Sequence, residues 1–223
     1  VSYDELSPNL VNAAVATEDS RFYRHSGIDF ESLARVLVKT VLGGSSSQGG
    51  GSTITQQLAK TLYPREDMGG SKFKMVWTKL KEWVTAVKLE RSYTKDEIMN
   101  MYMNQVFFGS NAYGIKAAAQ TFFGKAPIDL TVEEAATLVG MVNKPTRYNP
   151  ALNPERSLQR RNLVISRMEQ NGFLTKEERD SIQQIPITLS YQIQDHNAGV
   201  GPYFRDMLRR TMNAKEPKRS SYA

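Results

Sequence analysis

The sequence contains no cysteine, only two histidines and no long apolar run. The absence of cysteine excludes disulfide bonds, thiol catalysis and zinc–thiolate sites. His25 and His196 supply the only imidazole groups, so a histidine-rich metal centre is excluded too. No stretch approaches the ~20 apolar residues that a membrane-spanning helix needs. Because the chain starts at Val1 without a start methionine or signal peptide, we expect it to be part of a longer protein with its membrane anchor elsewhere.

The composition is that of a folded protein with a basic surface. The 223 residues are 40% hydrophobic and 23% charged, enough for one domain with a sizeable core or for two small lobes that share a cleft. The formal net charge is +6 and the sequence pI about 9.4. This balance favours an anionic partner, which the composition alone leaves open between nucleic acid, an anionic membrane surface and a phosphorylated substrate.

Helical spacing of apolar residues runs through most of the chain. Helices are expected to start near Ser7, Asp29, Thr53, Ser71, Thr94, Thr131, Asn153 and Thr175, where capping residues or capping boxes precede apolar periodicity. Residues 43–51 are glycine, serine and one glutamine, which predicts a flexible loop. Only residues 187–193 alternate as a strand would. The sequence therefore predicts a mainly α fold.

The first candidate catalytic residue is Glu18. It ends the apolar helix predicted from Ser7, and Phe22 and Tyr23 follow closely. A carboxylate among apolar neighbours suits general acid–base chemistry. The alternative is an exposed Glu18–Asp19 pair at a helix end, a common arrangement in soluble proteins.

A second candidate site is the glycine-rich run that leads into the helix near Thr53. Glycines before a helix N-terminus expose backbone N–H groups at the positive end of the helix dipole, which favours an anion. Ser52 and Thr53 add hydroxyl groups. The next turns carry three further polar side chains: Gln56, Gln57 and Lys60. No lysine follows the glycines directly, so this is not a Walker loop; the alternative is a linker with a helix cap.

The third candidate is Glu82, within the long helix predicted for residues 71–92. It lies opposite the main apolar stripe of that helix, three residues after Lys79. Such a pair is either an ordinary surface ion pair or a charge pair that lines a cleft.

Together these segments resemble the peptidoglycan glycosyltransferase family, which comprises the transglycosylase domains of class A penicillin-binding proteins and the monofunctional glycan polymerases. The family motif Glu-Asp-x-x-Phe-x-x-His-x-Gly is matched in full by residues 18–27. The motif Gly-x-Ser-Thr-x-Thr-Gln-Gln is matched by residues 50–57. The third motif, Arg-Lys-x-x-Glu, is matched only in part, because Thr78 replaces the arginine. Residues 95–104 resemble the fourth family motif. The whole resemblance extends from about Asp4 to Arg210.

The resemblance implies a lysozyme-like, two-lobed helical fold with a substrate cleft. It implies a glycosyltransferase domain over residues 1–200, with a membrane-proximal lobe around residues 40–80. Residues 201–223 would form a junction towards a transpeptidase domain. The implied location is the extracytoplasmic (periplasmic) face of a bacterial cell membrane.

The implied reaction is the polymerisation of lipid II into glycan strands, with inversion to β-1,4 linkages and release of undecaprenyl pyrophosphate. Glu18 would deprotonate the acceptor hydroxyl, and Glu82 would be a second catalytic glutamate. The resemblance assigns substrate binding to Asp19, Phe22, His25, Gly50, Ser52, Thr53, Gln56, Gln57, Lys60, Lys79, Tyr102 and Asn104. The implied partners are lipid II, the nascent glycan strand and the membrane surface, not nucleic acid. No cofactor is implied; a divalent cation, Mg²⁺ or Mn²⁺, remains an option at the pyrophosphate.

Two other functions compete with this one. A lysozyme-like lytic transglycosylase would degrade peptidoglycan with a similar glutamate, but it has no pyrophosphate to hold and no need for the loop at residues 50–57. A non-enzymatic membrane-binding module would explain the basic charge. It would not explain the presence of Glu18, Glu82 and the Gln56–Gln57 pair together.

Overall fold

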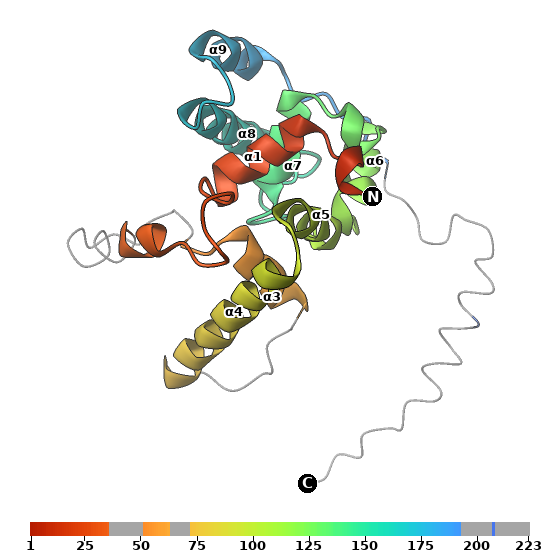
Figure 1. The fold of residues 1–223 in the computed structure, drawn as a ribbon. Coiled ribbons are helices and arrows are strands. Elements are labelled where there is room, and N and C mark those ends of the chain that lie inside the picture. The colour runs from red at the N-terminus through yellow and green to blue at the C-terminus, as the bar shows by residue number, and fades with distance from the viewer. Residues whose placement is uncertain (36–50, 63–71, 193–206, 208–223) are drawn as a thin grey trace. The chain divides into compact units, whose positions relative to one another are not determined.

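The computed structural model describes residues 1–35, 51–62, 72–192 and 207, except for the side chains of residues 72–76. Residues Val1–Gln192 form one compact unit (Figure 1). Gly50, most of the predicted flexible loop, and much of the predicted membrane-proximal lobe lie outside the described residues. The junction predicted for residues 201–223 lies outside them too, apart from Met207.

The described residues are mainly helical, which confirms the predicted fold class. The elements in order are η1 (Tyr3–Glu5), α1 (Pro8–Glu18), α3 (Ile54–Leu62), α4 (Lys72–Ser92), α5 (Lys95–Gln105), α6 (Gly114–Phe123), η2 (Pro127–Asp129), α7 (Val132–Met141), α8 (Pro154–Gln170) and α9 (Lys176–Gln184). Within the described chain, no helix combines the length and apolar character needed to cross a bilayer.

Side-chain caps explain where several helices begin. Ser7 caps α1 by accepting a hydrogen bond from the Asn9 backbone N–H, with Pro8 at the first helical position. The two predicted capping boxes are present, Thr94 with Glu97 and Thr131 with Glu134, and the helix start predicted at Thr175 has a third, with Glu178. The boundaries of α5, α7 and α9 thus follow directly from the sequence.

The strand predicted for residues 187–193 is not present in its described part. Residues 187–192 run without regular secondary structure. The backbone N–H groups of Ser190 and Gln192 donate hydrogen bonds to the carbonyls of Phe122 and Thr121, at the C-terminal end of α6. The alternating pattern therefore reflects an extended segment that satisfies helix-end carbonyls instead of pairing in a sheet.

The helices pack in two groups that meet near the end of α1. In the first, α7 packs against both α1 and α8 (Figure 1). Alanines at the buried faces of α1 and α7, such as Ala13 and Ala135, allow the helix backbones to approach closely. In the second group, α3 packs against α4 and α5. The first group holds the last turn of α1 in place, and the second holds the first turn of α3 opposite it.

Candidate active site

Glu18 is the last residue of α1, and its partly buried side chain reaches α3. Its Oε2 atom accepts a hydrogen bond of 3.0 Å from the Gln57 side-chain Nε2. The Oε1 atom of Gln57 in turn accepts a hydrogen bond of 3.2 Å from the hydroxyl of Tyr102 in α5. Three helices thus contribute to one polar chain that ends on the Glu18 carboxylate.

Asp19 is buried and joins the loop after α1 to the start of α3. Its Oδ2 atom lies 3.0 Å from the Ile54 backbone nitrogen and 2.9 Å from His25 Nε2. The other ring nitrogen of His25, Nδ1, accepts a hydrogen bond from the Gly27 backbone N–H. Because Nδ1 is an acceptor, Nε2 carries the proton and donates it to Asp19. His25 and Asp19 therefore hold each other and do not point into open solvent.

Gly27 holds the loop that follows α1 against both α3 and α4. Its carbonyl accepts hydrogen bonds from Thr53 Oγ1 at 2.8 Å and from Gln56 Nε2 at 3.2 Å. Its φ angle is +91°, and an added Cβ would lie 2.9 Å from backbone atoms of Ala86 in α4. Only glycine fits this position, because the backbone conformation and the close approach both exclude a side chain.

Lys79 links α4 to the start of α3. Its Nζ atom lies 2.7 Å from Glu82 Oε2 and 3.0 Å from Ser52 Oγ. The Glu82 side chain is 7% exposed and that of Lys79 is 42% exposed, so the alternative of an ordinary surface pair is wrong for Glu82. The ammonium group is held by a buried carboxylate and still faces solvent beside the N-terminus of α3.

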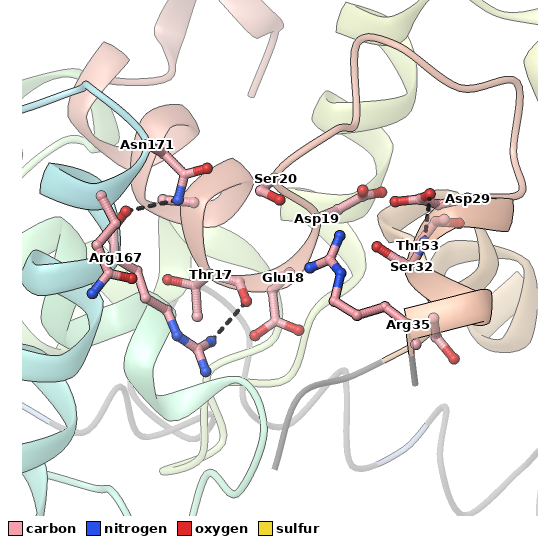
Figure 2. A pocket seen from close by; sticks show the side chains of 14 residues that line it. Thr17, Glu18, Asp19, Ser20, Asp29, Ser32, Arg35, Thr53, Arg167 and Asn171 are labelled. Carbon is pink, nitrogen blue, oxygen red and sulfur yellow. Dashed lines mark hydrogen bonds between the residues drawn. The ribbon is translucent and has the colours of Figure 1, made fainter. Parts of the chain in front are cut away.

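A cavity of about 270 Å³ opens next to Glu18 and reaches Ser52 and Thr53. Figure 2 shows Glu18 between Arg167 of α8 and Arg35. The Arg167 Nη1 atom donates a hydrogen bond of 2.9 Å to the Thr17 carbonyl. Burial lowers the pKa of Arg167, and repulsion from Arg160 lowers it further, while the attraction of Glu18 opposes both. The cavity thus combines three carboxylates, those of Glu18, Asp19 and Asp29, with two guanidinium groups.

The structure brings some of the predicted site residues to this cavity and places others elsewhere. Glu18, Asp19, Ser52 and Thr53 line it. Phe22 and Tyr102 are almost fully buried, and Lys60 is exposed further along α3. They do not line it, and neither does Asn104. The Asn104 side chain bonds instead to Val1 and to Asn100, one turn earlier in α5.

Several residues that line the cavity are not marked by any motif of the sequence, chiefly Arg35, Arg167 and Asn171. Arg167 lies 149 positions after Glu18 in an otherwise ordinary amphipathic helix. Nothing in its local pattern distinguishes it from the other arginines of α8. Among the described residues there is no group of three or more His, Asp or Glu side chains that could hold a metal ion.

Comparison with known proteins gives consistent matches. A family model described as Transglycosylase matches residues 1–169. Penicillin-binding protein 1A of Aquifex aeolicus is 41% identical over 94% of this chain and 27% of its own length. Penicillin-binding protein 1A of Escherichia coli is 37% identical over 95% of this chain and 24% of its own length. The chain thus spans about a quarter of the length of these relatives.

A solved structure gives a further match. The crystal structure of penicillin-binding protein 1A from Haemophilus influenzae aligns with 76% of this chain and 20% of its own chain, at 29% sequence identity and a TM-score of 0.41.

Proposed function

This chain belongs to the transglycosylase family of the penicillin-binding proteins, and on that premise we propose that it polymerises lipid II into peptidoglycan glycan strands. The observation that carries the proposal is the position of Glu18. One oxygen of its carboxylate is held by Gln57, and the side chain lines a cavity that also contains Ser52 and the start of α3. A fixed carboxylate near Ser52 and the cationic Lys79 that donates to it suits the joining of a sugar hydroxyl to a sugar pyrophosphate.

In the proposed reaction Glu18 is the general base. It takes the proton of the 4-hydroxyl of the acceptor sugar, and the hydroxyl oxygen forms a bond to the anomeric carbon of the donor. The bond from that carbon to the pyrophosphate oxygen breaks, and its electron pair leaves with undecaprenyl pyrophosphate. Attack from the face opposite the leaving group inverts the anomeric centre and gives a β-1,4 linkage.

Charge on the leaving pyrophosphate is stabilised by cations and N–H donors. Lys79 is oriented by Glu82 and Ser52 beside the N-terminus of α3, and a preorganised cation there stabilises developing negative charge. We assign Lys79 to the pyrophosphate and Glu82 to holding Lys79. A divalent cation, Mg²⁺ or Mn²⁺, would be held by the oxygens of the pyrophosphate, since Mg²⁺ commonly binds substrate phosphates.

The membrane is the proposed location of the substrate and of this domain. Three apolar side chains along one side of α4 are exposed: Trp77 by 53%, Leu80 by 42% and Val84 by 57%. An exposed apolar strip on a basic protein favours contact with an anionic membrane surface. The proposal places the domain at the extracytoplasmic face of a bacterial cell membrane. Because the relatives are penicillin-binding proteins about four times as long, it also includes a transpeptidase domain in the full protein.

The lytic alternative is not favoured. A glycosidase needs a protonated carboxyl group to donate a proton to the departing sugar oxygen. In polymerisation the carboxylate takes a proton instead, and a cation assists the departing pyrophosphate. Lys79, which donates a hydrogen bond to Ser52 at the edge of the cavity, supplies such a cation, for which a glycosidase has no use.

The test is to incubate the purified chain with labelled lipid II in detergent and to measure glycan strands by gel electrophoresis. We expect long strands from the unaltered chain and a rate about 10²- to 10⁴-fold lower for Glu18→Gln. Glu177→Gln, at an exposed position of α9, is the matched control and should polymerise normally. Equal polymer from Glu18→Gln would overturn the proposal. Fragments released from intact sacculi would favour the lytic function, and vesicle binding without either reaction would favour a membrane module.

A further inference from the structure

Tyr102 is a buried tyrosine whose hydroxyl is directed at another side chain and not at the cavity. The residue is 3% exposed, in the middle of α5. Its hydroxyl lies 3.2 Å from Gln57 Oε1. Burial raises the pKa of Tyr102 well above its ordinary value, and the negative charges of Glu18 and Asp19 raise it further. The hydroxyl therefore keeps its proton and is a hydrogen-bond donor to Gln57.

The direction of this hydrogen bond decides which end of the Gln57 amide faces Glu18. A glutamine side chain presents a carbonyl oxygen on one side and an NH₂ group on the other. The Tyr102 hydroxyl donates a hydrogen bond to the Gln57 oxygen. The NH₂ group of Gln57 therefore faces Glu18 Oε2, at 3.0 Å. In the reversed orientation the Gln57 carbonyl oxygen would face an oxygen of Glu18, and a general base that awaits a proton has none to share with it.

We propose that Tyr102 is a positioning residue for the base: by holding Gln57 Oε1, it fixes the amide so that its NH₂ group secures one oxygen of Glu18 and leaves the other for the acceptor hydroxyl. This inference rests on the proposed function of Glu18. Tyr102 itself is buried and does not line the cavity beside Glu18. It acts through Gln57 on the carboxylate that receives the proton when the new glycosidic bond forms.

The direct test is a double-mutant cycle on the full chain with Tyr102→Phe and Gln57→Ala. Phenylalanine keeps the packing of the ring and removes only the hydroxyl. We expect kcat for lipid II polymerisation to fall about tenfold in Tyr102→Phe, with little change in KM. A tenfold loss corresponds to the removal of one hydrogen bond, here the one between Tyr102 and Gln57. In the Gln57→Ala background the same substitution should change kcat less than twofold, because the group through which Tyr102 acts is gone.

A matched control variant gives a second readout that loss of packing would not produce. Tyr113→Phe removes the hydroxyl of an exposed tyrosine in the same chain, and it should leave both kcat and KM within twofold of the unaltered chain. Tyr102→Phe should lower kcat with little change in KM, because its hydroxyl acts through Gln57 on the base.

The outcomes separate this inference from the function on which it rests. If the unaltered chain makes no polymer, or if Glu18→Gln polymerises equally, the proposed function fails. If polymerisation requires Glu18 but Tyr102→Phe matches the unaltered chain, the positioning role alone is wrong. The same holds if Tyr102→Phe lowers kcat equally in both backgrounds, or if it raises KM as much as it lowers kcat. A far-UV circular dichroism spectrum and a melting curve establish that the Tyr102→Phe chain is folded before its rate is compared.

Discussion

The Asp19 side chain is the cap of helix α3: its Oδ2 atom accepts a hydrogen bond of 3.0 Å from the Ile54 backbone N–H, 35 positions later in the chain. The same oxygen accepts a hydrogen bond from His25. One buried carboxylate thus joins the end of α1 to the start of the helix that carries Gln57. The contact between Glu18 and Gln57 depends on this junction, because each residue lies within one turn of it.

We predict that Asp19→Ala destabilises the fold by about 2–4 kcal/mol. The substitution removes a helix cap and leaves two buried N–H groups, on Ile54 and His25, without their acceptor. Urea unfolding followed by circular dichroism measures the loss. Asp4→Ala, at an exposed position, is the control and should stay within about 0.5 kcal/mol of the unaltered chain. Similar free energies of unfolding for the two variants would contradict the capping role.

The helices could be predicted from the sequence because their signals are local. A capping threonine and the glutamate three residues later lie in one turn, so Thr94, Thr131 and Thr175 mark helix starts without any knowledge of the fold. Residues 187–192 mislead for the same reason. Their alternation is real, but their backbone N–H groups bond to carbonyls at the end of α6, which lies far away in the sequence.

The candidate site could be predicted only in part. Glu18 and the polar start of α3 were identified from motifs, and the structure places them side by side through Gln57. The motif did not reveal which of its residues face the cavity and which support others. Phe22 and Tyr102 were expected to bind substrate, yet both are buried. Arg167 reaches the cavity from α8 through tertiary packing alone, so no local pattern marks it.

We predict that Gly27→Ala is much more destabilising than Gly172→Ala. Both glycines have positive φ angles, +91° and +77°, so both substitutions carry the cost of about 1 kcal/mol for a left-handed backbone. At Gly172 an added Cβ meets nothing within 4 Å, whereas at Gly27 it meets the backbone of Ala86 at 2.9 Å. The difference between the two free energies of unfolding therefore measures the close approach of the loop to α4.

For this pair of alanine variants we expect a difference of at least about 2 kcal/mol, in the range of overpacking in a rigid core. Polymerisation by Gly27→Ala should also fall, because the Gly27 carbonyl holds Thr53 and Gln56 at the start of α3. Equal destabilisation at the two positions would show that the backbone conformation alone requires glycine.

We predict that Lys79→Ala lowers kcat/KM for lipid II by about 10²- to 10³-fold, the cost of removing one preorganised group that stabilises developing negative charge. The Lys79 side chain belongs to α4 and lies beside the start of α3. It is 42% exposed, so it can bind a pyrophosphate. Initial rates over a range of lipid II concentrations give the value. Lys88→Ala removes an exposed cation from the same helix, and it should leave kcat/KM within twofold. A similar loss in both variants would mean that net charge, not position, accounts for the effect.

We predict that the Asp29–Arg21 pair stabilises the fold at neutral pH and not in acid. Burial alone would raise the pKa of Asp29, but hydrogen bonds from Ser32 and Arg21 outweigh it and lower the pKa below its ordinary value of 3.8. A lowered pKa gives stability that is present above the pKa of the unfolded chain, about 4, and is lost as the pH falls through the lower value in the folded chain.

Asp29→Asn separates this contribution from the rest of the fold, because asparagine resembles a protonated aspartate. We expect its free energy of unfolding at about pH 7 to be lower than that of the unaltered chain by about 1–3 kcal/mol, the value of hydrogen bonds to a charged group. The difference should shrink steadily below about pH 4. Urea titrations of both chains at several pH values measure it. A difference that stays constant into acid would mean that the charge of Asp29 contributes nothing and that its hydrogen bonds to Ser32 act alone.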